Sequence, residues 1–181
     1  MNVSQAAREG IDFIFTKAAK ANLVLDGTDT CVVESLPGGK LAEPPERYLF
    51  VLTISSYLFR VMTIFHVADD RRTRDYFSQQ GTGPALDEAF GEVANLCCGA
   101  MNRDLGNYFS HLGMSTPFVL DRQCIPFFMP VLKPAYVSQH KAVINGDVTL
   151  HATLCVSAYA TLDFRVDTSV EEESTGELEM F

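Results

Sequence analysis

The sequence predicts an α+β fold, in which a largely antiparallel β-sheet packs against two to three helices. In residues 4–21 and 84–112, apolar residues recur every three or four positions, as in helices with one buried side. Apolar runs rich in β-branched and aromatic residues lie between and after these two segments, and such runs are typical of strands. Asn145-Gly146 is a strong signal for a two-residue hairpin turn, which joins antiparallel strands. Separate helices and hairpin-linked strands together indicate the α+β class.

The chain opens with the expected helix at 4–21, which Ser4 can cap through its side-chain oxygen. A strand is expected at 30–36, and a loop rich in proline and glycine follows at 37–45. The buried side of the first helix is expected to consist of Ile11, Ile14, Phe15 and Ala18.

Residues 48–67 form an apolar run of twenty residues, which is long enough to cross a bilayer. Arg60 stands in the middle of this run, and a central arginine costs about 3 kcal/mol in lipid. A Ser-Ser pair interrupts the run, and its β-branched and aromatic content favours a sheet. We therefore expect two strands here, at 47–54 and 57–67, in place of a membrane-spanning helix.

The second half begins with a short polar helix that opens at Asp69-Asp70 and ends near Gln80. The long helix follows, with Pro84 in its first turn and Gly113 at its end. The strands that complete the sheet are expected at 118–122, 126–133, 135–144 and 148–166, and the last stretch is long enough to bend into two strands.

Length and composition are those of one globular domain, expected over residues 1–168. The net charge is -9, and five glutamates lie in the last eleven positions. Residues 169–181 are therefore expected to form an acidic, disordered tail. The absence of a lysine and arginine stripe argues against nucleic acid as a partner.

The five cysteines include no Cys-x-x-Cys pair, and the four histidines show no metal-ligand spacing. We expect reduced cysteines, no metal, and a cytoplasmic protein without a signal peptide or membrane insertion. Cys97 and His111 fall on the same expected helix, but they are fourteen positions apart, which argues against a thiol nucleophile with a histidine base.

The long helix carries Glu92 and Asn95 nearly opposite its apolar stripe. At about 100° per residue, Asn95 lies about 60° from Glu92, and Gly99, Arg103 and Gly106 fall on the same outer face. Glycine at an exposed helix position costs roughly 1 kcal/mol relative to alanine, whereas bare backbone lets a second surface approach closely. Polar residues three apart are also common on ordinary solvated helices, so the spacing alone does not establish a function. The stripe itself consists of Leu86, Phe90, Val93, Cys97, Met101, Leu105, Tyr108 and Leu112.

On these residues the sequence resembles the CheC/CheX/FliY family of chemotaxis phosphatases, and within it CheX most closely. The family signature is Asp or Ser, three residues, Glu, two residues, Asn, twenty-one residues and Pro. Glu92, Asn95 and Pro117 fit that spacing, and Gly99 matches a glycine four residues after the asparagine. Glu88 departs from the signature, which has Asp or Ser there, and its extra negative charge could alter docking.

The resemblance implies a phosphatase that hydrolyses the phospho-aspartate of a CheY-like response regulator. By similarity, Asn95 would insert its carboxamide beside the acyl phosphate and hold the attacking water, while Glu92 would pair with the regulator's lysine. The Mg²⁺ would belong to the regulator, so no cofactor of the chain's own is expected. The further residues expected to contact the partner are Glu88, Gly99, Arg103 and Gly106.

Related proteins with two sites carry a second acid-amide pair, and the nearest counterpart in the first helix is Glu9 with Asp12. An ionised Asp12 cannot donate a hydrogen bond, so we expect a single site. A binding module without catalysis, similar to the middle domain of FliM, remains an alternative, as does an unrelated α+β domain with a chance match. The resemblance to CheX also makes a homodimer plausible through residues 136–166, although these strands could equally finish the sheet of a monomer.

Overall fold

The computed structural model describes residues 2–37 and 46–168, which build one seven-stranded sheet. Residues 38–45 of the expected loop and the expected tail at 169–181 lie outside the described residues. The strands are β1 (Cys31–Leu36), β2 (Tyr48–Ser55), β3 (Phe59–Val67), β4 (Gly113–Met114), β5 (Phe118–Asp121), β6 (Tyr136–Ile144) and β7 (Val148–Ala158). Their order is β1-β6-β7-β3-β2-β4, with β5 also on β2, and every pair is antiparallel.

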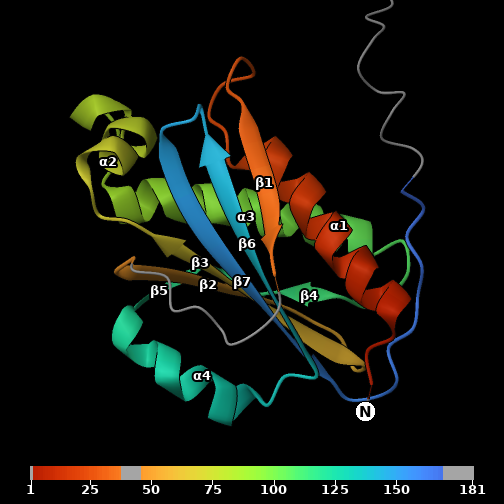
Figure 1. The fold of residues 1–181 in the computed structure, drawn as a ribbon. Helices are drawn as coiled ribbons and strands as arrows, with labels where there is room; N and C mark the ends of the chain where they lie inside the picture. The colour runs from red at the N-terminus through yellow and green to blue at the C-terminus, as the bar shows by residue number, and fades with distance from the viewer. Residues whose placement is uncertain (1, 38–45, 169–181) are drawn as a thin grey trace, which may run out of the picture.

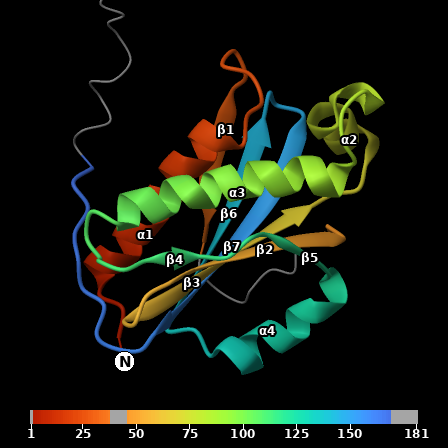
Figure 2. The same cartoon turned by 180° about the vertical axis from the view of Figure 1, so that it is seen from behind.

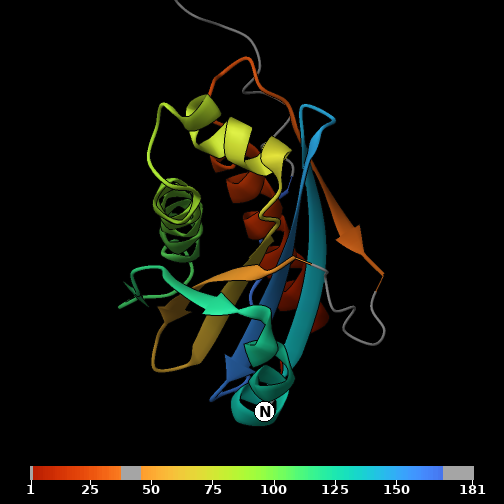
Figure 3. The same cartoon turned by 90° about the vertical axis from the view of Figure 1, so that its left-hand side faces the viewer.

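Four α-helices accompany this sheet in the described part of the chain: α1 (Gln5–Asn22), α2 (Arg71–Phe77), α3 (Leu86–Leu105) and α4 (Ile125–Leu132). Figure 1 shows the sheet running diagonally between α1 and α4, and Figure 2 shows α3 crossing it beside α1. Seen along the axis of α3, both long helices lie on the same side of the sheet (Figure 3). The predicted α+β class is confirmed, with one helix more than the two to three expected.

The main core lies between the sheet and the pair formed by α1 and α3. Phe90 of α3 is fully buried, and its ring meets those of Phe50 and Phe77 edge-on, with centroids 4.8 Å and 5.0 Å apart. Near the other end of α3, Asp104 lies 3.1 Å from Lys17 of α1. These contacts hold α3 at both ends and so fix which of its sides faces outward.

The apolar run at 48–67 forms β2 and β3, as predicted, and Arg60 is exposed on the sheet. In residues 2–37 and 46–168, no helix is long and apolar enough to span a bilayer. Asn145 and Gly146 join β6 to β7 with φ values of 51° and 71°, the double positive φ of the predicted hairpin turn.

The long helix is shorter than predicted, because it begins at Leu86 and ends at Leu105, with Gly106 as its C-cap. Pro84 precedes the helix, and Gly113 lies in β4. Beyond Gly106 the chain tightens into turns, in which the Tyr108 and Phe109 amides both donate to the Leu105 carbonyl oxygen.

Tyr108 continues the apolar spacing but not the helix, and it is 39% exposed. Its ring packs against Phe164, with centroids 5.1 Å apart. Phe164 belongs to the final segment of the chain. Tyr108 is therefore apolar because it packs on that segment, although it lies outside the helix.

The strand predicted at 126–133 is a helix, α4, which follows a 3₁₀ turn at Arg122–Cys124. Every residue of Ile125–Leu132 is apolar, so periodicity could not distinguish a strand from a buried helix. Proline fits the first turn of a helix, and Lys133 ends α4 in the left-handed conformation with a φ of 43°. Ile125, Phe128 and Leu132 of α4 pack on the sheet face opposite α1 and α3.

The long stretch expected at 148–166 ends as a strand at Ala158. Its continuation forms no second strand of the sheet and makes one isolated parallel bridge, between Leu162 and Val3. Phe164 then packs on Phe109, with ring centroids 5.0 Å apart, so this segment closes the open end of the main core.

His66 of β3 is 3% exposed and points to the α4 side of the sheet. Its Nε2 lies 2.9 Å from Thr153 Oγ1, and its Nδ1 has no hydrogen-bond partner among the described residues. Burial lowers the pKa of His66 from 6.5 to about 4, with a smaller opposing effect from Glu46 and a smaller lowering effect from His151. The folded protein therefore holds this histidine neutral.

We expect His66 to make the fold sensitive to acid. Between pH 6.5 and pH 4 the unfolded chain protonates His66 while the folded chain does not, so the stability present above pH 6.5 is lost as the pH falls. The loss should reach about 3 kcal/mol at pH 4. The variant His66→Gln, which retains a group that can bond Thr153, should lose less stability in this range. Urea unfolding at pH 7 and pH 4.5 measures the difference.

The exposed histidine variant His111→Gln is the matched control and should behave like the wild type. Equal losses for the wild type and His66→Gln would assign the acid sensitivity to other groups.

Candidate functional site

The outer face of α3 carries the residues that the sequence singled out. Glu92 is exposed and Asn95 is half-buried, one helical turn apart, while the opposite side of the helix is buried. Within the described residues, neither side chain has a hydrogen-bond or ion-pair partner in the chain. A free carboxylate and a free carboxamide thus lie side by side on a helix whose rotation is fixed by its core contacts.

Pro117 lies against α3 beside this pair. A Cβ atom built on Gly91 would have Pro117 Cγ as its nearest neighbour, at 3.9 Å. The segment that carries Pro117 is held by β2, because the Ser115 amide donates to the Thr53 carbonyl oxygen at 2.9 Å and the Thr53 amide donates to Ser115 Oγ at 3.0 Å. The structure therefore brings together the three positions that match the signature, Glu92, Asn95 and Pro117, although 21 residues separate the last two.

Gly99 leaves bare backbone one turn beyond Asn95. A Cβ atom built there would contact only Arg103 Nη1, at the ordinary distance of 3.8 Å. The described chain thus offers room for a methyl group at this position, and no packing within the fold requires the glycine.

The other expected partner-binding residues are placed differently. Glu88 is exposed one turn before Glu92, and Arg103 is exposed one turn beyond Gly99. Gly106 was predicted to lie inside the helix, but it is the C-cap residue at the helix end. A Cβ atom added there would approach the Arg103 carbonyl oxygen to 3.0 Å. This close approach within the fold disfavours a side chain at 106, and a contact of Gly106 with a partner stays a prediction.

Leu96 is a surface feature that the sequence interpretation missed. It is 59% exposed, next to Asn95 and one turn beyond Glu92. Single exposed apolar residues are normal on protein surfaces, so Leu96 is of interest here only because it adjoins Glu92 and Asn95. The available signal was that Leu96 falls outside the otherwise regular apolar stripe of the helix.

The cysteines of α3 do not form a nucleophilic site. Cys97 and Cys98 are fully buried, and burial raises the pKa of Cys98 to about 12 and that of Cys97 well above its usual value. His111 lies beyond the end of α3. All five cysteines are free in this structure.

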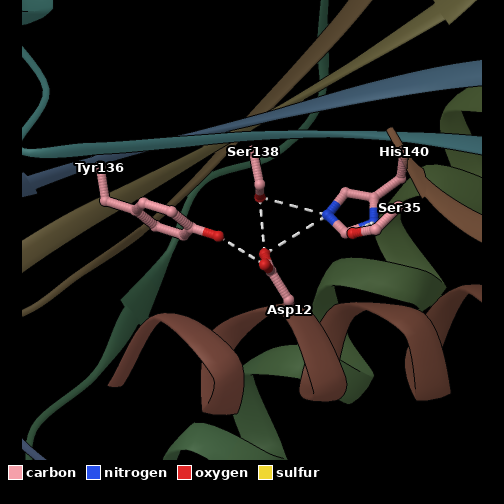
Figure 4. Close-up of polar contacts among 5 residues, drawn as sticks. All are labelled: Asp12, Ser35, Tyr136, Ser138 and His140. Atoms are coloured by element: carbon pink, nitrogen blue, oxygen red, sulfur yellow. Dashed lines mark hydrogen bonds and ion pairs between the residues drawn. The ribbon is translucent and has the colours of Figure 1, made fainter. Parts of the chain in front are cut away.

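On α1, the residues that would correspond to a second site, Glu9 and Asp12, make hydrogen bonds within the fold. Figure 4 shows Asp12 reaching from α1 to β6, where its carboxylate accepts hydrogen bonds from Tyr136 Oη and from Ser138 Oγ, the latter at 2.6 Å. His140 Nε2 lies 3.4 Å from the same carboxylate. The neighbouring Glu9 accepts a hydrogen bond from Gln5 Nε2 at 2.8 Å. Asp12 is therefore a link between α1 and the sheet, which favours a single outward site on α3.

Across residues 2–37 and 46–168, no group of three or more histidine, cysteine, aspartate or glutamate side chains is arranged to hold a metal ion.

The sequence matches no family model and no curated protein. Its fold, however, matches solved structures over most of their length. CheX from Vibrio vulnificus has a TM-score of 0.54 at 10% identity, covering 81% of this chain and 96% of that chain. A CheX–CheY–BeF₃–Mg²⁺ complex from Borrelia burgdorferi gives 0.58 at 9% identity, covering 83% and 97%. A CheC-like superfamily protein from a Shewanella species gives 0.52 at 9% identity, covering 86% and 99%.

The chain therefore has the fold of the CheX and CheC-like chemotaxis proteins. This confirms the fold that the sequence resemblance implied.

We expect the link through Asp12 to contribute strongly to stability. Asp12→Ala removes the shared acceptor of Tyr136 and Ser138, both half-buried, and should lower the free energy of unfolding by about 2–3 kcal/mol. Asp12→Asn keeps one acceptor oxygen and should cost less. Glu9→Ala, on the exposed side of the same helix, is the control and should change stability by under about 0.5 kcal/mol. Urea denaturation of the three variants measures these values, and an Asp12→Ala loss no larger than that of Glu9→Ala would contradict the expectation.

Proposed function

We propose that this protein is a phosphatase that hydrolyses the phospho-aspartate of a CheY-like response regulator. The observation that carries the proposal is the free, outward pair of Glu92 and Asn95, placed beside Pro117 on a helix that the core holds rigidly. Two further facts support it. The fold is that of CheX, and the CheX of Borrelia burgdorferi was solved in complex with CheY.

In this proposal, Asn95 is the residue that positions the attacking water. A carboxamide can donate a hydrogen bond to one group and accept one from water, so it can orient water toward a phosphorus atom. Glu92, one turn away, pairs with a lysine of the regulator and fixes the register of docking. The regulator supplies the phosphoryl group and the Mg²⁺, so this chain needs no metal of its own.

Leu96 and Gly99 form the surface around the pair. Leu96 gives the docking face an apolar contact that becomes buried when the regulator binds. Gly99 lets the regulator approach the helix backbone closely beside Asn95. This use explains the glycine, which no packing among the described residues requires.

A second candidate is a regulator-binding module without catalysis. Glu88 favours it, because this exposed residue stands one turn before Glu92 and has a longer side chain than the Asp or Ser of the signature. A complex with a phosphorylated regulator that forms but never releases phosphate would support this candidate.

A cytoplasmic homodimer joined through the sheet also remains a prediction. Within the described sheet β6 pairs with β1 and β7, and β7 pairs with β6 and β3, so residues 136–158 complete the sheet of one chain. A second copy would therefore have to join at the outer edge of β1 or at that of β4 and β5. Sedimentation of the purified protein tests the dimer.

We expect Asn95→Ala to lower the rate of phosphate release from phosphorylated receiver domains by at least about 100-fold, because the variant cannot orient the water. Glu92→Ala should mainly weaken binding and raise KM. Asn107→Ala, an exposed asparagine beyond the end of α3, is the matched control and should release phosphate at the wild-type rate. Equal rates for Asn95→Ala and the wild type would remove Asn95 from the chemistry.

We expect Gly99→Ala to separate stability from activity. The added methyl group has room in the fold and should raise stability by about 0.5–1 kcal/mol, because alanine is the better helix former. The same methyl group should lower kcat/KM with the regulator, because it occupies the surface that the partner approaches. Thermal unfolding and phosphate release on the same preparation test both effects, and a more stable variant with unchanged kcat/KM would show that the partner does not approach Gly99.

A further inference from the structure

Arg103 is an unpaired cation on the same face of α3 as Asn95, two turns further along the helix. It is exposed, and among the described residues it has no ion pair or side-chain hydrogen bond. The other charged residues between Leu86 and Leu105 are acidic: Asp87, Glu88, Glu92 and Asp104. Asp104 is paired with Lys17, and Asp87 falls by helical geometry on the buried side of α3, so the outward face has two carboxylates, Glu88 and Glu92, and one guanidinium.

The side chain of Arg103 extends along α3 toward Asn95. Side chains of an α-helix point back toward its N-terminus. In agreement with this tendency, Arg103 Nη1 lies 3.8 Å from the position of a Cβ atom at Gly99, one turn nearer to Asn95. The side chain is thus laid along the outer face of the helix, where Gly99 presents no side chain.

Gly99 separates the carboxamide from the guanidinium. Positions four apart on a helix have Cβ atoms about 5–6 Å from each other, so Asn95 borders the bare backbone on one side and Arg103 on the other. A guanidinium offers several N–H donors in a planar arrangement that matches phosphoryl oxygens. A group that enters between the two side chains therefore meets an amide and a cation at once.

The charge of the proposed substrate makes this cation significant. A phosphoryl group on an aspartate is anionic, and it approaches a helix face that carries Glu88 and Glu92. If Glu92 pairs with the regulator's lysine, it neutralises part of the positive charge that would otherwise face the phosphoryl group. A cation of the phosphatase itself can replace that charge.

We propose that Arg103 is the site's own phosphoryl-binding cation, which donates hydrogen bonds to the phosphoryl oxygens while Asn95 holds the water. The proposal rests on the proposed phosphatase function. In the reaction, the water oxygen bonds to phosphorus as the bond from phosphorus to the aspartyl oxygen breaks. Both water protons end on the released phosphate, and the aspartate returns to its carboxylate form. Arg103 keeps its protons throughout and stabilises the charge on the transferred group.

The test compares Arg103→Ala, Arg103→Gln and Arg103→Lys in phosphate release from a phosphorylated CheY-like receiver domain. The alanine and glutamine variants should lose about 10- to 100-fold in kcat/KM, the range expected for hydrogen bonds between charged groups. Lysine should retain part of the activity, because it keeps the charge but not the planar donor arrangement. Arg60→Ala is the matched control, since Arg60 is exposed on β3 on the sheet face opposite α3, and it should keep wild-type activity.

A binding measurement separates contact with the phosphoryl group from general docking. The affinity for the receiver domain with Mg²⁺ is measured with and without beryllofluoride, which imitates the phosphoryl group. The wild type should bind the beryllofluoride form more tightly, and Arg103→Ala should lose most of that preference. An equal loss of affinity for both forms would assign Arg103 to the protein surface of the partner and overturn the proposal.

Asn95→Ala is included so that the two proposals can fail separately. Hydrolysis that depends on Asn95 but is unchanged in Arg103→Ala and Arg103→Gln would overturn the role of Arg103 alone. The absence of hydrolysis by the wild type with every receiver domain tested would overturn both proposals. Thermal unfolding of each Arg103 variant should match the wild type, as expected for an exposed residue.

Discussion

The fixed rotation of α3 about its own axis is the constraint on which the rest of the site depends. Phe90 packs its ring against Phe50 and Phe77, and the buried Met101 and Leu105 hold the far end of the helix, beside the ion pair of Asp104 with Lys17. Aromatic rings that meet edge-on resist sliding, because displacement opens voids that cost contacts on both sides. The backbone of α3 is therefore held in one orientation, and this directs Asn95 and Glu92 to the outer face of the helix.

The two long helices use their polar residues in opposite ways. On α1, Asp12 turns toward the sheet and binds Tyr136 and Ser138, so its carboxylate serves the stability of the fold. On α3, Asn95 and its neighbours face solvent without partners in the described chain. A surface group that satisfies no internal hydrogen bond can be replaced at little cost to stability, so the fold itself does not require Glu92 and Asn95.

The division of labour in the proposed reaction follows from what the chain presents. Its outer face offers an amide, carboxylates, a guanidinium and one apolar side chain, and in the proposal each of these groups contacts the partner protein. Orientation of water and compensation of charge are the contributions that such groups can make. These two contributions do not require an enclosed site before the partner binds. The exposed positions of Leu96 and Glu92 agree with this.

The sequence by itself determined the features that depend on local geometry: the helical stripe through Phe90 and Met101, the outward direction of Glu92 and Asn95, and the hairpin at Asn145. Tertiary structure alone decided where α3 ends, because Tyr108 packs on Phe164 from the last segment of the chain. It also decided that Ile125–Leu132 is helical, since an apolar run without periodicity fits either state. The contacts of Asp12 with β6 and of Pro117 with α3 join residues far apart in sequence, and such contacts arise only when the sheet and helices pack.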